Sequence, residues 1–78
     1  MSMSFSVRVV DEHGRPRRGI RVYADFGIWN GGLTEYTDDS GWATFEPSGD
    51  YVTAEIFVDG ESQGDHGISD GETFSFTL

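Results

Sequence analysis

The chain of 78 residues contains no cysteine and no lysine, and each absence excludes a kind of covalent crosslink. Without cysteine it forms no disulfide, and two histidines with no thiol leave too few ligands for a structural zinc site. Without lysine, no covalent bond can form between a lysine amine and a carboxyl or amide side chain. A chain this short buries only about 60% of the surface of its unfolded form. We therefore expect the isolated chain to be marginally stable, and we expect contact with a neighbouring domain, a partner or another copy to increase its stability.

Long apolar runs are also absent. No segment approaches the roughly 20 apolar residues that a membrane-spanning helix needs, so we predict no membrane insertion. The first four residues, Met1 to Ser4, have neither the positive charge nor the apolar core of a signal peptide, and no secretion signal is expected. A cytoplasmic location and export as part of a larger assembly both remain open.

Positive charge is scarce and is confined to the start of the chain. The net charge is −9, and twelve of the fourteen acidic residues follow the last arginine. The five basic residues are Arg8, Arg15, Arg17, Arg18 and Arg21. Because a nucleic-acid-binding domain carries a dominant basic face, we predict no nucleic-acid partner and no binding to anionic membranes. The acidity fits high solubility, adaptation to high salt or a basic partner, and the sequence leaves these open.

Alternation of apolar and polar residues predicts short strands along the whole chain and no helix. The predicted strands cover residues 4–10, 20–26, 33–37, 42–46, 51–58, 62–68 and 72–78. Clusters of glycine, aspartate and serine separate them, as expected for turns. Short strands at this spacing predict an all-β sandwich.

The turn clusters also predict three hairpins. Residues 4–10 and 20–26 pair across a long tip, and Asp59-Gly60 is a two-residue hairpin turn. Residues 38–41 join 33–37 to 42–46 through a type I turn in which Gly41 takes a positive φ. Tyr36 then lies beside Ala43. This register directs Thr34, Tyr36, Ala43 and Phe45 to the core and Leu33, Glu35, Thr37, Trp42 and Thr44 outward.

Four segments in order carry a resemblance to a known family: residues 9–16 (VVDEHGRP), 19–22 (GIRV), 37–45 (TDDSGWATF) and 49–51 (GDY). Over nearly the whole chain they resemble the carboxypeptidase regulatory-like domains of the transthyretin-like sandwich group. The resemblance implies a seven-strand Greek-key β-sandwich, transthyretin-like or immunoglobulin-like, in one domain over residues 1–78. It implies a structural or interaction module beside enzymes, transporters or secretion assemblies, and no reaction. A short middle loop and the lack of a neighbouring domain depart from the family.

The sequence contains no pattern typical of an enzyme or a metal protein. His13 and His66, the side chains that titrate near neutral pH, lie in polar, turn-rich stretches where we expect them to be solvated. No serine lies in an elbow motif. The end of the chain, residues 74–78, lacks the Tyr-Arg-Gly-Ser tail of the transthyretin-like hydrolases. The acidic loops 38–41 and 59–65 do not match the calcium-binding loop of EF-hands, and turn formation explains them better. We predict no catalysis, no cofactor and no metal site.

Arginine and tryptophan are the remaining candidates for a functional site. The predicted partner-binding residues are Arg15, Arg17, Arg18, Trp29 and Trp42. The arginines crowd the loop between the first two strands, which is either a solvated tip or a docking patch for an acidic partner or another copy. Trp29 lies in a glycine-flanked loop, and Trp42 is predicted to face outward near Glu35 and Thr37. Both residue types are enriched in the energetic centres of protein interfaces.

These residues predict a noncatalytic structural or protein-binding module that serves as an accessory domain of a larger enzyme, surface or secretion assembly. Its partner is then another protein or a second copy of the chain. The alternative is a small carbohydrate-binding module, because exposed aromatic faces such as those of tryptophan also stack on sugars.

Overall fold

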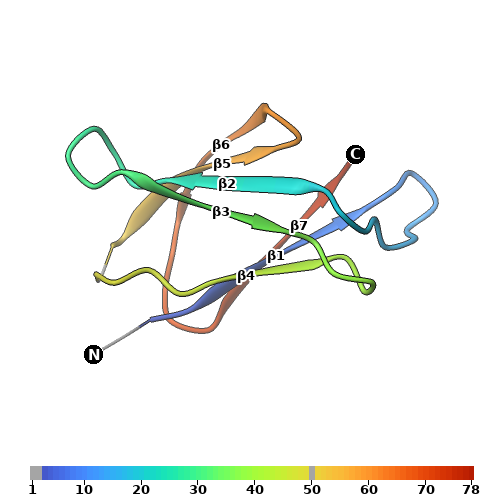
Figure 1. Ribbon diagram of the computed structural model, residues 1–78, viewed down its shortest axis with the longest axis horizontal. Coiled ribbons are helices and arrows are strands. Elements are labelled where there is room, and N and C mark those ends of the chain that lie inside the picture. The colour runs from blue at the N-terminus through green and yellow to red at the C-terminus, as the bar shows by residue number, and fades with distance from the viewer. Residues whose placement is uncertain (1–2, 50) are drawn as a thin grey trace.

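The computed structural model describes residues 3–49 and 51–78, which form two β-sheets packed face to face (Figure 1). The strands are β1 (Phe5–Val10), β2 (Arg21–Asp25), β3 (Gly32–Tyr36), β4 (Trp42–Phe45), β5 (Thr53–Val58), β6 (Glu61–Gly67) and β7 (Glu72–Thr77). All seven predicted strands are present, so the all-β sandwich is confirmed. The described residues contain no helix that could cross a membrane. Asp50, part of the G-x-Y segment, lies outside the described residues.

The strands follow a Greek-key order that involves both sheets. One sheet has the order β4-β1-β7 and the other β3-β2-β5-β6. β2, β3 and β4 follow one another, and β5 returns to pair with β2, as in a Greek key. β1 and β7 pair in parallel, whereas the other pairs are antiparallel. This order differs from that of an immunoglobulin constant domain, in which the first two strands share a sheet.

The core lies between the sheets and consists of the inward positions of the alternating strands. Its buried members are Met3, Phe5, Val7, Val9, Val22, Ala24, Phe26, Ala43, Phe45, Ala54, Ile56, Val58 and Ile68. Phe5 is at the centre, because its ring stacks on Phe45 at 5.0 Å and meets Phe26 and Phe74 edge-on. Fully burying a side chain of this kind contributes about 1.5–3 kcal/mol. Val52 precedes β5 and is exposed, although it lies within the predicted strand 51–58.

Two of the three predicted hairpins are wrong, because their connections cross from one sheet to the other. β1 pairs with β4 and β7, and only a single bridge between Val10 and Pro16 links it to the segment before β2. β3 and β4 lie in different sheets. The hairpin of β5 and β6 is confirmed, and both turn residues, Asp59 and Gly60, have the positive φ of a type I′ turn (53° and 85°).

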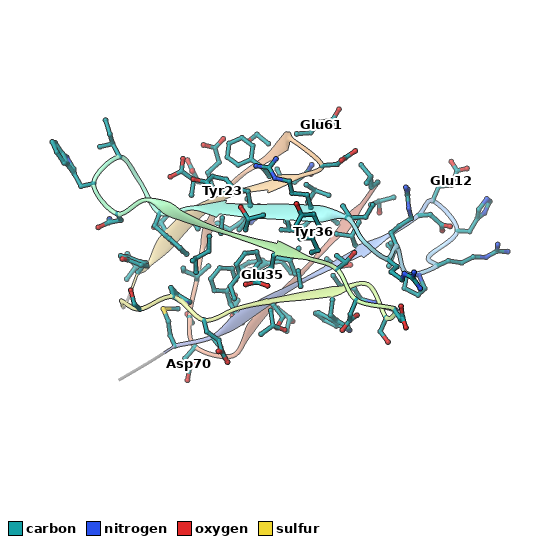
Figure 2. All side chains as sticks on the ribbon, viewed as in Figure 1. Glu12, Tyr23, Glu35, Tyr36, Glu61 and Asp70 are labelled. Atoms are coloured by element: carbon teal, nitrogen blue, oxygen red, sulfur yellow. The ribbon has the colours of Figure 1, made fainter. Side chains whose placement is uncertain are left out.

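The inward and outward faces of β3 are the reverse of the prediction. Tyr36 is 62% exposed and Thr34 is also exposed, whereas Leu33 packs against the core. Thr37, which follows β3, is buried at 4% exposure. The predicted faces followed from pairing β3 with β4 in one sheet, and that pairing does not exist. Glu35 is exposed as predicted, and Figure 2 shows it between β3 and β4.

Candidate functional site

The predicted partner-binding residues lie in three separate places on the sandwich. One end of the molecule carries the β1–β2 loop, the β3–β4 loop and the β5–β6 turn, and the other carries the β2–β3 loop and the β4–β5 and β6–β7 connections (Figure 1). Arg15, Arg17 and Arg18 lie at the first end and Trp29 at the second. Trp42 begins β4 on the three-stranded sheet. The structure therefore does not bring these residues into one site.

Asp11 organises the start of the arginine-bearing β1–β2 loop. Its Oδ1 atom accepts hydrogen bonds from the backbone amides of His13 (2.8 Å) and Arg15 (3.0 Å). The bond from the Arg15 amide, with a further contribution from His13, lowers the pKa of Asp11 below its ordinary value of 3.8. The charged form of Asp11 therefore holds the loop in shape, while the Arg15 side chain stays exposed.

Arg17 is half-buried and takes part in the hydrogen bonds that hold the loop in place. Its Nη1 donates to the carbonyl of Leu78 (2.9 Å), and its backbone amide donates to the carbonyl of Val9 (2.9 Å). Its own carbonyl accepts a bond from Thr37 Oγ1 (2.6 Å), which in turn accepts one from the Ile20 amide (2.9 Å). These bonds fasten the loop to β1, to the end of β3 and to the end of the chain.

Arg18 is exposed and forms a salt bridge with Asp39 across the adjoining β3–β4 loop (3.3 Å). An exposed pair of this kind contributes about 0–1 kcal/mol. An open hollow of about 530 Å³ lies between Arg18 and the residues 37–40. In the β3–β4 loop, Asp38 Oδ1 accepts bonds from the amides of Ser40 (2.9 Å) and Trp42 (3.0 Å), which confirms the predicted turn chemistry.

Trp42 is half-buried on the outer face of the three-stranded sheet. It lies opposite Arg8 of β1, whose Cζ atom is 5.9 Å from the centre of the indole ring. The outward direction was predicted correctly, but the predicted neighbours Glu35 and Thr37 are wrong, because β3 belongs to the other sheet. Stacking of Arg8 on this partly exposed ring contributes about 0.5–1 kcal/mol. Trp42 thus has a partner within the molecule.

Trp29 and its neighbour Ile28 form the tip of the β2–β3 loop. They are 92% and 90% exposed, which makes them the most exposed large apolar residues of the described chain. Val52, 77% exposed, precedes β5 at the same end, because the register of β2 with β5 pairs Asp25 with Glu55. We call Ile28, Trp29 and Val52 the apolar tip.

Hydrogen bonds close the base of the β2–β3 loop without involving the side chains at its tip. The amides of Asn30 and Gly31 both donate to the carbonyl of Gly27 (3.1 Å each), and the Phe26 amide donates to the carbonyl of Gly31 (2.9 Å). The Asn30 side chain also donates to the Phe26 carbonyl (3.1 Å). The buried Phe26 ring stacks on Tyr51 at 4.5 Å, which fastens the loop to the β4–β5 connection.

The end of the sandwich that carries the apolar tip is acidic. The carboxylates on its strand ends and connections are Asp25, Glu46, Glu55, Asp65, Asp70 and Glu72. All five arginines lie in β1, in the β1–β2 loop or at the start of β2, at or toward the opposite end. Among the described residues, the end that carries the apolar tip therefore has carboxylates and no arginine.

Sequence reasoning missed an aromatic row on the outer face of the four-stranded sheet. Tyr23 of β2 lies opposite Phe57 of β5, with ring centres 5.9 Å apart. Tyr36 of β3 lies opposite Arg21, whose Cζ atom is 6.0 Å from the Tyr23 ring (Figure 2). We call Tyr23, Tyr36 and Phe57 the aromatic face. Its signal in the sequence is the alternation Arg21-x-Tyr23-x-Asp25, which places these three side chains on one face of β2.

The two histidines differ in burial and in their contacts. His13 is exposed, as predicted. His66 is half-buried, which corrects the predicted solvation: its Nε2–H donates to the Gln63 carbonyl (2.9 Å), and its ring lies 5.2 Å from Phe74 and 5.4 Å from Phe76. Within residues 3–49 and 51–78, no three histidine or carboxylate side chains are placed to hold a metal ion.

No family model matches this chain, and no curated protein matches it.

Proposed function

We propose that this chain is a noncatalytic structural or protein-binding module of the transthyretin-like, carboxypeptidase regulatory-like kind, acting as an accessory domain of a larger enzyme, surface or secretion assembly. The Greek-key order of the two sheets supports the proposal, because it agrees with the fold that the sequence resemblance implies. The chemistry of the histidines supports it too. Among the described residues their Nε2 atoms interact with the Gln63 carbonyl and the Glu12 carboxylate rather than with a serine or threonine hydroxyl.

The apolar tip is the single observation that carries the binding role. Trp29 and Ile28 are adjacent and almost fully exposed, although every other isoleucine and leucine of the described residues is buried or partly buried. Tryptophan is among the residues that contribute most to protein interfaces. A loop already closed by its own hydrogen bonds loses little conformational freedom on binding. The tip therefore offers a partner a preorganised apolar anchor.

The acidic surroundings of the tip indicate the charge of that partner. A protein surface with an apolar pocket and a basic rim fits this end, because complementary charge speeds association and favours the correct orientation. The exposed side chains of Arg15 and Arg18 at the other end offer a second contact of opposite sign. Arg17 offers less to that contact, since its Nη1 already donates to the Leu78 carbonyl and its side chain is half-buried.

Affinity capture with matched variants tests the binding role. The protein and its Ile28→Ser/Trp29→Ser variant are immobilised and exposed to extract of the source cells, and the bound proteins are quantified by mass spectrometry. The control is Tyr36→Ser, which removes an exposed apolar residue from a different surface. We expect a specific protein to be retained by the wild type and the control and lost with the tip variant. Equal retention by all three proteins contradicts the proposal.

A carbohydrate-binding module is the second candidate function, and the exposure of Trp29 is the observation that favours it. Its indole is 92% exposed and contacts no other aromatic ring of the described residues, so it is free to stack on a sugar. Trp42 suits this role less well, because Arg8 covers its ring. A titration with oligosaccharides, using the Trp29→Ser variant, shows whether a sugar binds at Trp29 or at another surface.

A further inference from the structure

The aromatic face combines ring surfaces with polar groups in a regular arrangement across the four-stranded sheet. Strand register places Tyr23 beside Phe57 in one row. Two residues earlier along β2, Arg21 begins the adjacent row, and two residues later Asp25 lies opposite Glu55. A shallow hollow of about 230 Å³ is lined by Arg21, Tyr23, Asp25, Phe57 and Gly60. Aromatic rings therefore lie between a cation on one side and carboxylates on the other.

The Tyr23 ring passes close to Gly32 of β3, where a side chain on β3 would block it. A methyl group on Gly32 would overlap the Tyr23 ring, with the position of the added carbon only 2.5 Å from Cζ of that ring. The absence of a side chain at Gly32 thus lets the ring cross over β3. Tyr36, on the same face, is 62% exposed and stacks on no other aromatic ring in the part of the chain that the structure describes. The face is therefore broad and shallow rather than a closed pocket.

The polar groups beside the rings keep unused hydrogen-bonding capacity. The salt bridges of the described residues join His13 to Glu12 and Arg18 to Asp39, so Arg21 has no carboxylate partner there. Asp25 uses Oδ1 to accept a bond from the Gly27 amide (2.9 Å), which leaves Oδ2 as an acceptor. The face thus offers several donors from a guanidinium and an acceptor from a carboxylate, with aromatic carbon between them.

We propose that this face binds a neutral oligosaccharide chain. A sugar ring presents an apolar face of C–H groups, which fits Tyr23 and Tyr36, and hydroxyl groups that both donate and accept, which fit Arg21 and Asp25. An apolar ligand requires a more enclosed pocket than this open face. Phosphorylated or acidic ligands are repelled by the row of Asp25, Glu55 and Asp65 and by a net charge of −9. The site is separate from the apolar tip and does not depend on the proposed protein partner.

Titration with neutral hexasaccharides tests this site. The probes are cellohexaose, maltohexaose, xylohexaose, mannohexaose and chitohexaose, each followed by calorimetry and by the backbone amide shifts of the ¹⁵N-labelled protein. We expect at least one probe to bind with a Kd below about 1 mM and to shift amides of β2, β3 and β5. Tyr36→Ala is expected to weaken binding roughly fivefold or more, because an aromatic contact is lost. Trp29→Ser is the matched control and is expected to leave the Kd unchanged.

The outcomes separate this site from the tryptophan alternative. If Trp29→Ser abolishes binding and Tyr36→Ala does not, the sugar binds at the apolar tip and the inference is overturned. If no probe produces heat or shifts at millimolar concentration, the aromatic face only stabilises the sheet and the inference is also overturned. Because Tyr36 is exposed at the edge strand β3, its substitution leaves the core intact, and thermal unfolding of the variant verifies this.

Discussion

Replacing Thr37 by valine removes one hydroxyl group and keeps the shape of a side chain that is only 4% exposed. That hydroxyl accepts a hydrogen bond from the Ile20 amide (2.9 Å) and donates one to the Arg17 carbonyl (2.6 Å). Valine leaves both backbone groups without this partner. At about 1 kcal/mol for each bond, we expect the free energy of unfolding to fall by about 2 kcal/mol. For a domain of this size, the melting temperature falls by roughly 8–16 °C.

Urea unfolding followed by tryptophan fluorescence measures this change, and Thr37→Ser is the matched control. Serine keeps both hydrogen bonds and loses only a methyl group, at a cost of about 1 kcal/mol. The valine variant should therefore be less stable than the serine variant by about 1 kcal/mol, with the same dependence on urea. A valine variant as stable as the serine variant or the wild type would refute the role assigned to the hydroxyl.

Two further predictions concern the loops. Gly41 has φ 82°, and an added methyl group would lie 2.7 Å from the Val9 carbonyl oxygen, so Gly41→Ala should lower the free energy of unfolding by about 2 kcal/mol or more. Gly60 has a similar φ but open space around it, so the control Gly60→Ala should lower the free energy of unfolding by only about 1 kcal/mol. Equal losses in the two variants would show that the close contact at Gly41 is unimportant. The pKa of Asp11 is lowered in the folded state, so its contribution is present above pH 3.8 and is lost as pH falls through the folded pKa. Asp11→Asn should therefore lose less stability than the wild type between pH 6 and pH 2.5 in thermal unfolding, and parallel losses in the two proteins would contradict this role.

The positions of the strands could be predicted, because each strand follows from the alternation and the turn residues of its own segment. The pairing of the strands could not be predicted in this way. Alternation in β1 and β5 places Phe5 and Ile56 inward, and the Asp59-Gly60 turn determines its own hairpin. The loop after β3 has equally clear turn residues, yet it leads from one sheet to the other. A turn specifies that the chain reverses, but the sheet that receives the next strand depends on packing between distant segments. The faces of β3, including Tyr36, were wrong for this reason.

The sequence identified a residue of the candidate site only where the type and local surroundings of that single residue were sufficient. Trp29 was identified from its glycine-flanked loop, and the structure gives it 92% exposure. Arg17 was grouped with its neighbours, because nothing in the sequence indicates that the end of the chain lies beside it. The aromatic face was missed since it needs Tyr23, Tyr36 and Phe57 from three strands, and only the register of the sheet brings them together.

The proposed binding role of the apolar tip requires that the fold displays Ile28 and Trp29 without depending on them for stability. The decisive measurement is the free energy of unfolding of the Ile28→Ser/Trp29→Ser variant, obtained by urea unfolding followed by far-ultraviolet circular dichroism. Because both side chains are at least 90% exposed and the loop is closed by other groups, we predict a change within about 0.5 kcal/mol of the wild type. A loss of more than about 1.5 kcal/mol would mean that the pair packs within the molecule, and would contradict a surface kept for a partner.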